Sequence, residues 1–347
     1  MVSTSSIFKN QTILITGGTG SFGKTLAKRL LTENECNKVI IFSRDEWKQW
    51  EMRRSDPIYD HPKIRYFLGD VRDERRLLRA FDGVDLIVHA AALKQVPAAE
   101  YNPTEFIRTN INGAMNVIDA AINCGVKKVI ALSTDKAVNP VNMYGATKLC
   151  SDKLFVAGNA YVGARGYPHF SVVRYGNVAA TRGSIIPFWQ KLIEQGITTL
   201  PITDERMTRF WITLDQSVDF VCHCLGLIER GGEIFVPKIP SIHIADLADA
   251  MAPHIKKEIC GIRPGEKLHE LMISSDDARH TVEYPKYYVI LPELIVDEVI
   301  SDKNCKNAST LKGKAVPEDF IYASNTNKHW LDKDAIKQFL SQQTAVL

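Results

Sequence analysis

The sequence predicts an α/β fold in which a doubly wound parallel sheet carries a smaller mixed α/β lobe. Two observations support this prediction. Short apolar runs alternate with amphipathic helical segments through the first half of the chain, which is typical of a parallel sheet with helices on both faces. A glycine-rich turn joins the first apolar run to the first helix, at the edge where such sheets bind ligands.

The elements follow one another in a regular order. Strands are expected at residues 12–16, 39–42, 64–68, 85–89, 128–132 and 170–174, and helices between them at 24–31, 73–80, 103–124 and 144–157. The carboxyl ends of parallel strands meet at one edge of the sheet. We therefore expect the polar residues that follow these strands to lie near one another.

Three glycines follow the first strand at a spacing of three residues. Gly17, Gly20 and Gly23 permit a tight turn and a close approach of the backbone to a pyrophosphate, which the N-terminus of the next helix attracts. With a strand before it and a helix after it, the pattern predicts a Rossmann-type dinucleotide site. The alternative is a glycine-rich turn that binds nothing.

The second strand ends in Ser43, Arg44 and Asp45. An acid at this position usually binds the ribose 2′-hydroxyl of NAD, whereas an arginine suits a 2′-phosphate. Arg44 therefore predicts NADP, with Lys48 in support. Asp45 leaves NAD open, and a solvated arginine on a loop is a further alternative.

Two acid–base pairs follow the fifth strand. Tyr144 and Lys148 lie one helical turn apart on the same face, where the ammonium favours the phenolate and thus lowers the pKa of the tyrosine. Asp135 and Lys136 form a second pair just upstream, which an enzyme that only oxidised an alcohol would not need. The alternatives are an ordinary pair on a helix surface and a surface ion pair of little energetic value.

Composition excludes several classes of function. The 347 residues carry a formal charge of only +3 and no dense basic run, which argues against nucleic acid as a partner. We expect no export signal, no membrane span and a cytoplasmic location, because the N-terminus is polar and no apolar run approaches bilayer length. The run Cys222 to Cys224 lies in a predicted helix, so we expect packing residues there and no metal.

Prolines at positions 187, 201, 237, 240, 253 and 264 break the regular alternation after about residue 177. We therefore expect a nucleotide-binding domain at residues 1–176 and a substrate-binding lobe with a C-terminal tail at 177–347. A helix at about 215–229 is expected to pack back on the sheet.

At this point the motifs resemble a known family. The glycine turn, Asp70-Val71, Ala90-Ala-Ala92 and Tyr144-x-x-x-Lys148 are similar to the extended short-chain dehydrogenases/reductases that act on nucleotide sugars. The more specific stretches at 92–97, 133–136, 207–213 and 261–270 resemble the inverting UDP-N-acetylglucosamine 4,6-dehydratases of the pseudaminic acid pathway. Retaining dehydratases have Thr-Asp-Glu where this chain has Thr134-Asp135-Lys136, and membrane-anchored relatives tend to replace Tyr144 with methionine.

The resemblance implies a hydro-lyase that uses NADP, acts on a UDP-sugar and forms homo-oligomers. It implies cofactor contacts at Gly17, Thr19, Gly20, Ser21, Phe22, Gly23, Ser43, Arg44, Asp45, Lys48, Asp70, Val71, Ala90, Lys94, Leu132, Ser133, Tyr144, Lys148 and Val178. It implies substrate contacts at Lys94, Asn177, Arg209 and Arg263, the two arginines on the diphosphate.

The resemblance also assigns catalytic roles. Tyr144 would accept the proton of the carbon-4 hydroxyl, which Ser133 or Thr134 would hydrogen-bond, and Lys148 would assist. Lys136 would then remove the carbon-5 proton, for which its pKa must be lowered. Asp135, with a raised pKa, would protonate the leaving hydroxyl. His269 and Glu270 are expected to be structural.

Two other functions stay open. A 4-epimerase of the same fold needs the tyrosine–lysine pair but not Asp135 and Lys136. A dinucleotide-sensing regulator would bind the cofactor without turnover, and such proteins usually lack the tyrosine–lysine pair.

Overall fold

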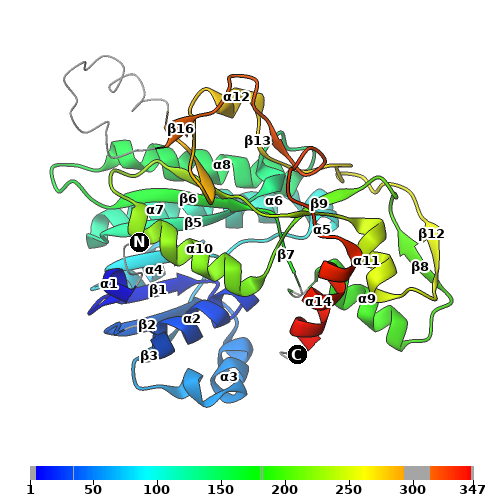
Figure 1. The fold of residues 1–347 in the computed structure, drawn as a ribbon. Coiled ribbons are helices and arrows are strands. Elements are labelled where there is room, and N and C mark those ends of the chain that lie inside the picture. Colours follow the sequence, from blue (N-terminus) through cyan, green and yellow to red (C-terminus); the bar gives the residue numbers. More distant parts are fainter. Residues whose placement is uncertain (1–4, 34, 180, 182, 293–312, 345–347) are drawn as a thin grey trace.

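A single large sheet forms the centre of the molecule (Figure 1). The computed structural model describes residues 5–344 except 34, 180, 182 and 293–312. The sheet has ten strands in the order β16-β14-β15-β10-β6-β5-β4-β1-β2-β3. From β10 to β3 in this order the neighbours run parallel, whereas β15, β14 and β16 add antiparallel strands at one edge. The order 3-2-1-4-5-6 confirms the predicted doubly wound α/β fold.

The strands and helices have the following bounds. The strands of the large sheet are β1 (Thr12–Thr16), β2 (Lys38–Ser43), β3 (Ile64–Leu68), β4 (Leu86–His89), β5 (Lys128–Thr134), β6 (His169–Tyr175), β10 (Ile234–Pro237), β14 (Thr281–Glu283), β15 (Tyr287–Ile290) and β16 (Lys314–Ala315). The helices of the same part are α1 (Ser5–Phe8), α2 (Ser21–Glu33), α3 (Glu46–Ser55), α4 (Glu74–Phe81), α5 (Val96–Tyr101), α6 (Pro103–Phe106), α7 (Gly113–Cys124), α8 (Met143–Gly158) and α10 (Leu214–Leu227). All six predicted strands are present.

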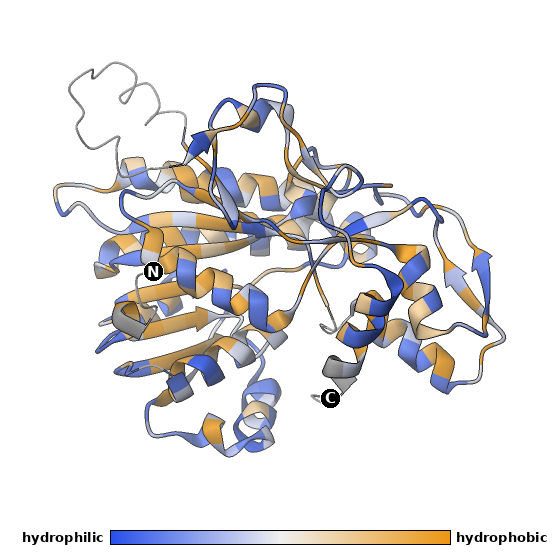
Figure 2. Ribbon diagram, in the orientation of Figure 1, coloured by the Kyte–Doolittle hydropathy of each residue, from blue (hydrophilic) through white to orange (hydrophobic). Residues whose placement is uncertain are grey.

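Alternate residues of each strand enter two different cores. In β1, Leu14 packs with α4, α7 and α8, whereas Ile13 and Ile15 pack with α2 and α10 on the other face. Figure 2 shows the resulting pattern, with apolar strands between helices that turn polar residues outward. Each fully buried aliphatic side chain contributes roughly 1.5–3 kcal/mol. The two cores thus fix the strand ends that carry the site.

The helix predicted at 103–124 is divided into three parts. Between α6 and α7, residues Ile107–Asn112 form a π-helical turn. Asn110 in this turn is 2% exposed and binds both the N–H and the carbonyl of Leu93, each at 2.9 Å, and the hydroxyl of Thr147 at 3.0 Å. The wider turn therefore ties the segment after β4 to α8, and π-turns often occur at functional sites.

A smaller unit lies beside the carboxyl ends of the strands, at the right in Figure 1. It comprises β7 (Asn177–Val178), α9 (Ile185–Glu194), β8 (Thr199–Ile202), β9 (Thr208–Ile212), β11 (Ser241–His243), α11 (Ile244–Met251), β12 (Lys256–Ile259) and α14 (Lys333–Thr344). Trp189, Trp211, Leu200 and Leu247 belong to its own core. The remaining described elements are β13 (Leu271–Ile273), α12 (Ser275–Ala278) and β17 (Tyr322–Ala323), and Met272, Ile273 and Tyr322 from β13 and β17 pack in a core of the large sheet.

Residues beyond 176 contribute to both units. Helix α10 packs against α2 and the large sheet, and β10, β14, β15 and β16 extend that sheet. The predicted boundary between residues 176 and 177 stays a prediction. Among the described helices, none is long and apolar enough to cross a bilayer.

Candidate active site

The glycine turn between β1 and α2 is shaped for close backbone approach. Gly17 has a positive φ of 66°, and a Cβ on it would lie 2.9 Å from the backbone of Ala91. A Cβ on Gly23 would lie 2.5 Å from the Cα of Gly18, so glycine here lets α2 pack closely on the turn. Such a cradle, followed by the N-terminus of a 13-residue helix, fits a pyrophosphate.

Hydrogen bonds tie this turn to neighbouring strand ends. The Thr19 and Ser43 hydroxyls lie 3.0 Å apart, and Thr16 Oγ1 lies 2.8 Å from Nδ1 of His89. Other residues predicted to contact the cofactor lie at or just after the carboxyl ends of strands, or at the start of α2. Ser21 and Phe22 begin α2, and Val71 is buried beside α7. Ala90 follows β4, Leu132 and Ser133 belong to β5, and Val178 ends β7. The structure thus brings these residues to one edge of the sheet.

The residues after β2 have distinct partners. Asp45 accepts a hydrogen bond from the Lys48 N–H at 3.0 Å, which caps α3, and its carboxylate also pairs with the Lys48 ammonium at 3.0 Å. Arg44 is 54% exposed and lies 4.0 Å from Asp70, which binds Arg72 at 2.8 Å. The acid is therefore engaged in starting a helix, while the Arg44 guanidinium is directed along the edge of the sheet.

Helix α8 begins at Met143, after the short segment that follows the end of β5 at Thr134. Asn142 caps it by accepting the Gly145 N–H at 2.7 Å, and the 3-10 turn Asp135–Ala137 lies directly beside its first turn. A Cβ on Gly145 would overlap the carbonyl oxygen of Lys136. Glycine at 145 therefore allows Tyr144 and Lys136 to share one site.

Replacing Gly145 with alanine is expected to push the 3-10 turn away from α8. Overpacking of this kind typically costs about 1–3 kcal/mol of stability, and it should also lower activity by displacing Lys136. Gly226→Ala is the matched control, because it lies near the end of α10 and an added Cβ would have no neighbour within 4 Å, so it should be neutral or stabilising by about 0.5 kcal/mol. Urea unfolding of both variants measures the difference, and equal stabilities would contradict the close contact.

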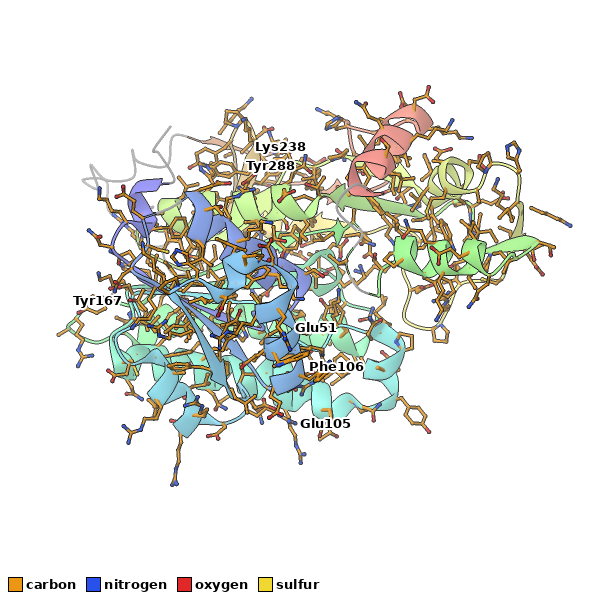
Figure 3. All side chains as sticks on the ribbon, turned by 90° about the horizontal axis from the view of Figure 1, so that it is seen from below. Glu51, Glu105, Phe106, Tyr167, Lys238 and Tyr288 are labelled. Atoms are coloured by element: carbon orange, nitrogen blue, oxygen red, sulfur yellow. The ribbon has the colours of Figure 1, made fainter. Side chains whose placement is uncertain are left out.

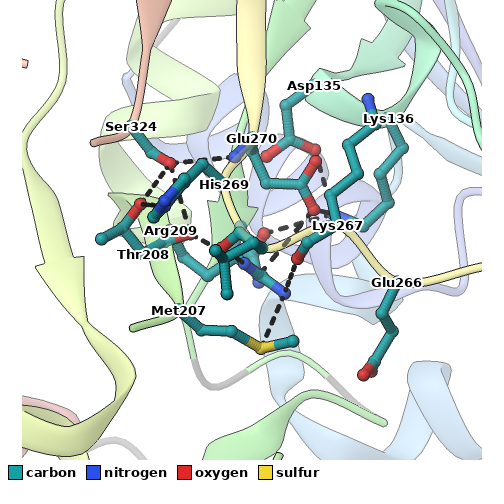
Figure 4. Close-up of polar contacts among 12 residues, drawn as sticks. Asp135, Lys136, Met207, Thr208, Arg209, Glu266, Lys267, His269, Glu270 and Ser324 are labelled. Atoms are coloured by element: carbon teal, nitrogen blue, oxygen red, sulfur yellow. Dashed lines mark hydrogen bonds and ion pairs between the residues drawn. The ribbon is translucent and has the colours of Figure 1, made fainter. Parts of the chain in front are cut away.

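Four charged residues meet beside this turn (Figure 4). The Lys136 ammonium lies 3.0 Å from Oδ1 of Asp135 and 3.1 Å from Oε1 of Glu270, and Arg209 Nε lies 3.8 Å from the same Glu270 oxygen. Asp135 is 0% exposed and Glu270 2%. The predicted acid–base pair is therefore an ion pair at least partly withdrawn from solvent, with a second carboxylate on it.

The pKa of Lys136 is shifted against the prediction, whereas the pKa of Asp135 is shifted in the predicted direction. Burial opposes the charge of Lys136, but the carboxylates of Asp135 and Glu270 outweigh it, so the pKa of Lys136 is raised. The prediction of a lowered Lys136 pKa is wrong, because two acids hold the proton on the amine. Burial raises the pKa of Asp135, against the attraction of Lys136, in the direction a general acid requires.

The tyrosine–lysine pair also differs from prediction. Burial raises the pKa of Tyr144 to about 12, although the charge of Lys136 and a hydrogen bond with Thr134 act to lower it. Lys148 is not the cation that favours the phenolate here. It is 3% exposed, and burial lowers its own pKa while Asp152 opposes that shift. The expected lowering of the Tyr144 pKa by Lys148 is therefore wrong.

A buried network behind the pair was missed in the sequence. Ser133 donates to Asp152 at 2.7 Å, and Arg174 lies 3.6 Å from the same carboxylate. The Ser133 hydroxyl thus donates its proton to Asp152, whereas Thr134 hydrogen-bonds Tyr144. The signal available was the spacing of Asp152 four residues after Lys148, on the same helix face.

The predicted substrate residues do not all converge. Asn177 Oδ1 lies 3.5 Å from the Lys136 ammonium. Lys94 is exposed as a whole residue, but its amine is partly withdrawn from solvent, and this burial and the charge of Lys136 lower the pKa of Lys94. Arg263 is exposed on a separate loop, where Glu266 accepts its backbone N–H at 3.3 Å.

Arg209 is occupied by the protein itself. Its two terminal nitrogens donate to the carbonyls of Thr208, Leu268 and Lys267 at 2.8–3.1 Å, and to the Met207 sulfur at 3.4 Å. In this arrangement Arg209 holds the loop before Glu270. A role on a diphosphate, which stays a prediction, would require these bonds to be exchanged.

Known proteins share both the sequence and the fold of this chain. Residues 13–292 match the family described as "Polysaccharide biosynthesis protein". The chain is 54% identical over 337 residues to a UDP-N-acetylglucosamine 4,6-dehydratase (inverting) of Campylobacter jejuni, with 96% of this chain and 98% of the relative covered.

Two further matches are informative. A UDP-glucose 4-epimerase of Rickettsia akari is 44% identical over 291 residues, which cover 82% of this chain and 84% of that one. The X-ray structure of Pen from Bacillus thuringiensis is similar with a TM-score of 0.86 and 33% identity, over 97% of this chain and 98% of that one.

Proposed function

We propose that this chain, which belongs to the polysaccharide biosynthesis protein family of extended short-chain dehydrogenases/reductases, dehydrates UDP-N-acetylglucosamine with inversion at carbon 5. The product would be UDP-2-acetamido-2,6-dideoxy-β-L-arabino-hex-4-ulose. The observation that carries the proposal is the ion pair of buried Asp135 and half-buried Lys136 beside Tyr144. The near full-length similarity to the Campylobacter dehydratase supports it.

Three groups of the chain divide the proton transfers. Tyr144 accepts the proton of the carbon-4 hydroxyl as carbon 4 becomes a ketone, and the adjacent carbon 5 is thereby made acidic. Lys136 then removes the carbon-5 proton, and Asp135 protonates the hydroxyl that leaves carbon 6. Elimination leaves Lys136 protonated and Asp135 ionised, so this pair needs no further proton. Carbon 5 gains one proton when carbon 6 is reduced, which balances the proton that Tyr144 accepted, and its delivery to the face opposite Lys136 inverts carbon 5.

The direct contact between Lys136 and Asp135 allows one proton transfer to prepare both groups for dehydration. Transfer of one proton from the ammonium to the carboxylate, across 3.0 Å, produces both the neutral amine and the protonated acid that dehydration needs. The raised pKa of Asp135, which burial causes, favours that transfer, whereas the raised pKa of Lys136 opposes it. A single proton shift thus converts an inert ion pair into a base and an acid.

The cradle at Gly17 to Gly23 would hold a nicotinamide dinucleotide, which when bound accepts the hydride from carbon 4 and returns it to carbon 6. We assign the preference to NADP. Asp45 is engaged in capping α3, so Arg44 is the group at this strand end that suits a 2′-phosphate.

Arg44→Ala is expected to weaken NADP binding by about tenfold or more and to leave NAD binding nearly unchanged, because only the former has a 2′-phosphate. Isothermal titration of both dinucleotides measures the change. Arg54→Ala, a similar exposed arginine on α3, serves as the control. Equal losses for NADP and NAD would refute the assignment.

Product mass separates the three candidate functions. Purified protein incubated with UDP-N-acetylglucosamine and NADP should yield a product lighter by one water. An epimerase, which the similarity to the Rickettsia proteins keeps as the second candidate, would give an isomer of equal mass that elutes separately. A dinucleotide sensor would leave the sugar unchanged, and either outcome would refute dehydration.

The resemblance extends the proposal to biological context. We place the reaction at the first step of pseudaminic acid synthesis, in the cytoplasm, by a homo-oligomer that needs neither nucleic acid nor a membrane as a partner. Size-exclusion chromatography with light scattering tests the oligomer.

A further inference from the structure

Glu270 reaches the Lys136 amine from outside the nucleotide-binding half of the chain. It lies at the end of the loop that precedes β13, and its Oε1 is 3.1 Å from the Lys136 nitrogen. Its other oxygen, Oε2, is buried without a hydrogen-bond partner among the described residues. A carboxylate oxygen left in this state is costly, so the position of Glu270 must be maintained by other contacts.

Those contacts fix the backbone of Glu270. Its N–H donates to Oγ of Ser324 at 2.9 Å, and the Ser324 N–H donates to the Glu270 carbonyl at 2.8 Å. The Ser324 hydroxyl also contacts that of Thr208 at 2.7 Å, which in turn lies 2.8 Å from Nδ1 of His269 (Figure 4). Ser324 is fully buried and Thr208 1% exposed, so the anchor is rigid.

The proposed reaction does not require the carboxylate of Glu270. Asp135 alone would suffice as the partner of Lys136 and as the acid. The charged and titratable groups that face Lys136 are Asp135, Glu270, Arg209, Lys94, Lys267 and Tyr144. Among them, only Asp135 and Glu270 are acids, and each contacts the amine directly.

We propose that Glu270 is a positioning residue, which is held from the C-terminal part of the chain and orients the protonated Lys136 amine against Asp135. This inference rests on the proposed function only for its consequence in catalysis. The charge of Glu270 adds to that of Asp135 in raising the pKa of Lys136 against burial. Removing the Glu270 charge should therefore lower that pKa.

The direct test measures the protonation of the Lys136 amine and does not depend on the proposed reaction. Competitive acetylation with acetic anhydride, quantified by mass spectrometry of the peptide containing Lys136, reports the fraction of neutral amine. Glu270→Gln should increase labelling of Lys136 about tenfold at a fixed pH, for a fall of one pKa unit. A change below about twofold would overturn the proposal.

Two comparisons make this result specific. Glu283→Gln removes a different acid, which lies 2.6 Å from Lys238, and it should leave labelling of Lys136 unchanged. Lys238 lies over the ring of Tyr288, where Figure 3 shows the two side chains together. Glu270→Asp keeps the charge and should label like the parent protein.

If Glu270→Gln does not fold, Ser324→Ala, which loosens the anchor, should raise Lys136 labelling instead, and unchanged labelling would overturn the proposal.

The effect of Glu270 on catalysis can be measured in the pH dependence of the rate. If Lys136 must be neutral to remove the carbon-5 proton, the acidic limb of the pH–rate profile should move to lower pH in Glu270→Gln. A merely structural role would lower the rate at every pH without moving the limb. Failure of the parent protein to dehydrate the sugar would refute the proposed function and leave the labelling result to decide on Glu270.

Discussion

Lys136→Ala is expected to lower the rate of dehydration by about two to four orders of magnitude, the usual contribution of a general base. The variant loses the amine that removes the carbon-5 proton, but it keeps Tyr144 and the glycine cradle. Oxidation at carbon 4 should therefore still occur, and the reduced nicotinamide should accumulate. Rapid-mixing absorbance, followed by mass analysis of the sugar, measures both steps.

Lys127→Ala provides the control for this experiment. Lys127 also pairs with an aspartate, Asp85 at 2.9 Å, but on the exposed amino-terminal side of the sheet. Its loss should leave the rate unchanged. Normal turnover in Lys136→Ala would exclude Lys136 as the base, whereas loss of both steps would indicate that it acts earlier than proposed.

Tyr144→Phe should abolish the first step instead. Without the phenol, the proposed acceptor of the carbon-4 proton is gone, and we expect a loss of about two to four orders of magnitude in kcat. Because the ring is retained in its buried position, folding should change little. In contrast to Lys136→Ala, no reduced nicotinamide should accumulate.

The pH dependence of Tyr144 adds a sharper expectation. Burial raises the pKa of this phenol to about 12, so the ligand-free protein holds it neutral throughout the physiological range. If the tyrosine must act as a base, bound cofactor and substrate have to lower that value. Ultraviolet difference titration with and without NADP tests this, with Tyr161→Phe, an exposed tyrosine, as the control. An unchanged pKa in the complex would argue that Tyr144 is only a hydrogen-bond donor.

The sequence predicted the part of the fold that depends on local pattern. Apolar strands and the glycine turn have strong signals of period and composition, and β1 to β6 lie where they were expected. The antiparallel edge of β14, β15 and β16 and the π-turn at Ile107–Asn112 were not predicted. Both depend on tertiary contacts, such as the hydrogen bonds of Asn110 to Leu93, which leave no periodic signal.

The sequence predicted that Asp135, Lys136 and Tyr144 lie together, but it predicted neither their charges nor the buried network at Asp152 and Arg174. The spacing that places Tyr144 and Lys136 in one site could be inferred from the end of one strand and the start of the next helix. Glu270, however, lies more than a hundred residues away in sequence, and it contributes to the reversal of the expected pKa shift of Lys136. Burial and long-range charge decide protonation, and neither can be read from a motif.

The most direct measurement is the NMR spectrum of the sugar formed from UDP-N-acetylglucosamine in deuterated water. We expect a 4-keto-6-deoxy sugar with deuterium at carbon 5 and couplings of the inverted, L-arabino configuration. UDP-N-acetylgalactosamine without deuterium, or a 4-keto sugar that retains the original configuration at carbon 5, would contradict it.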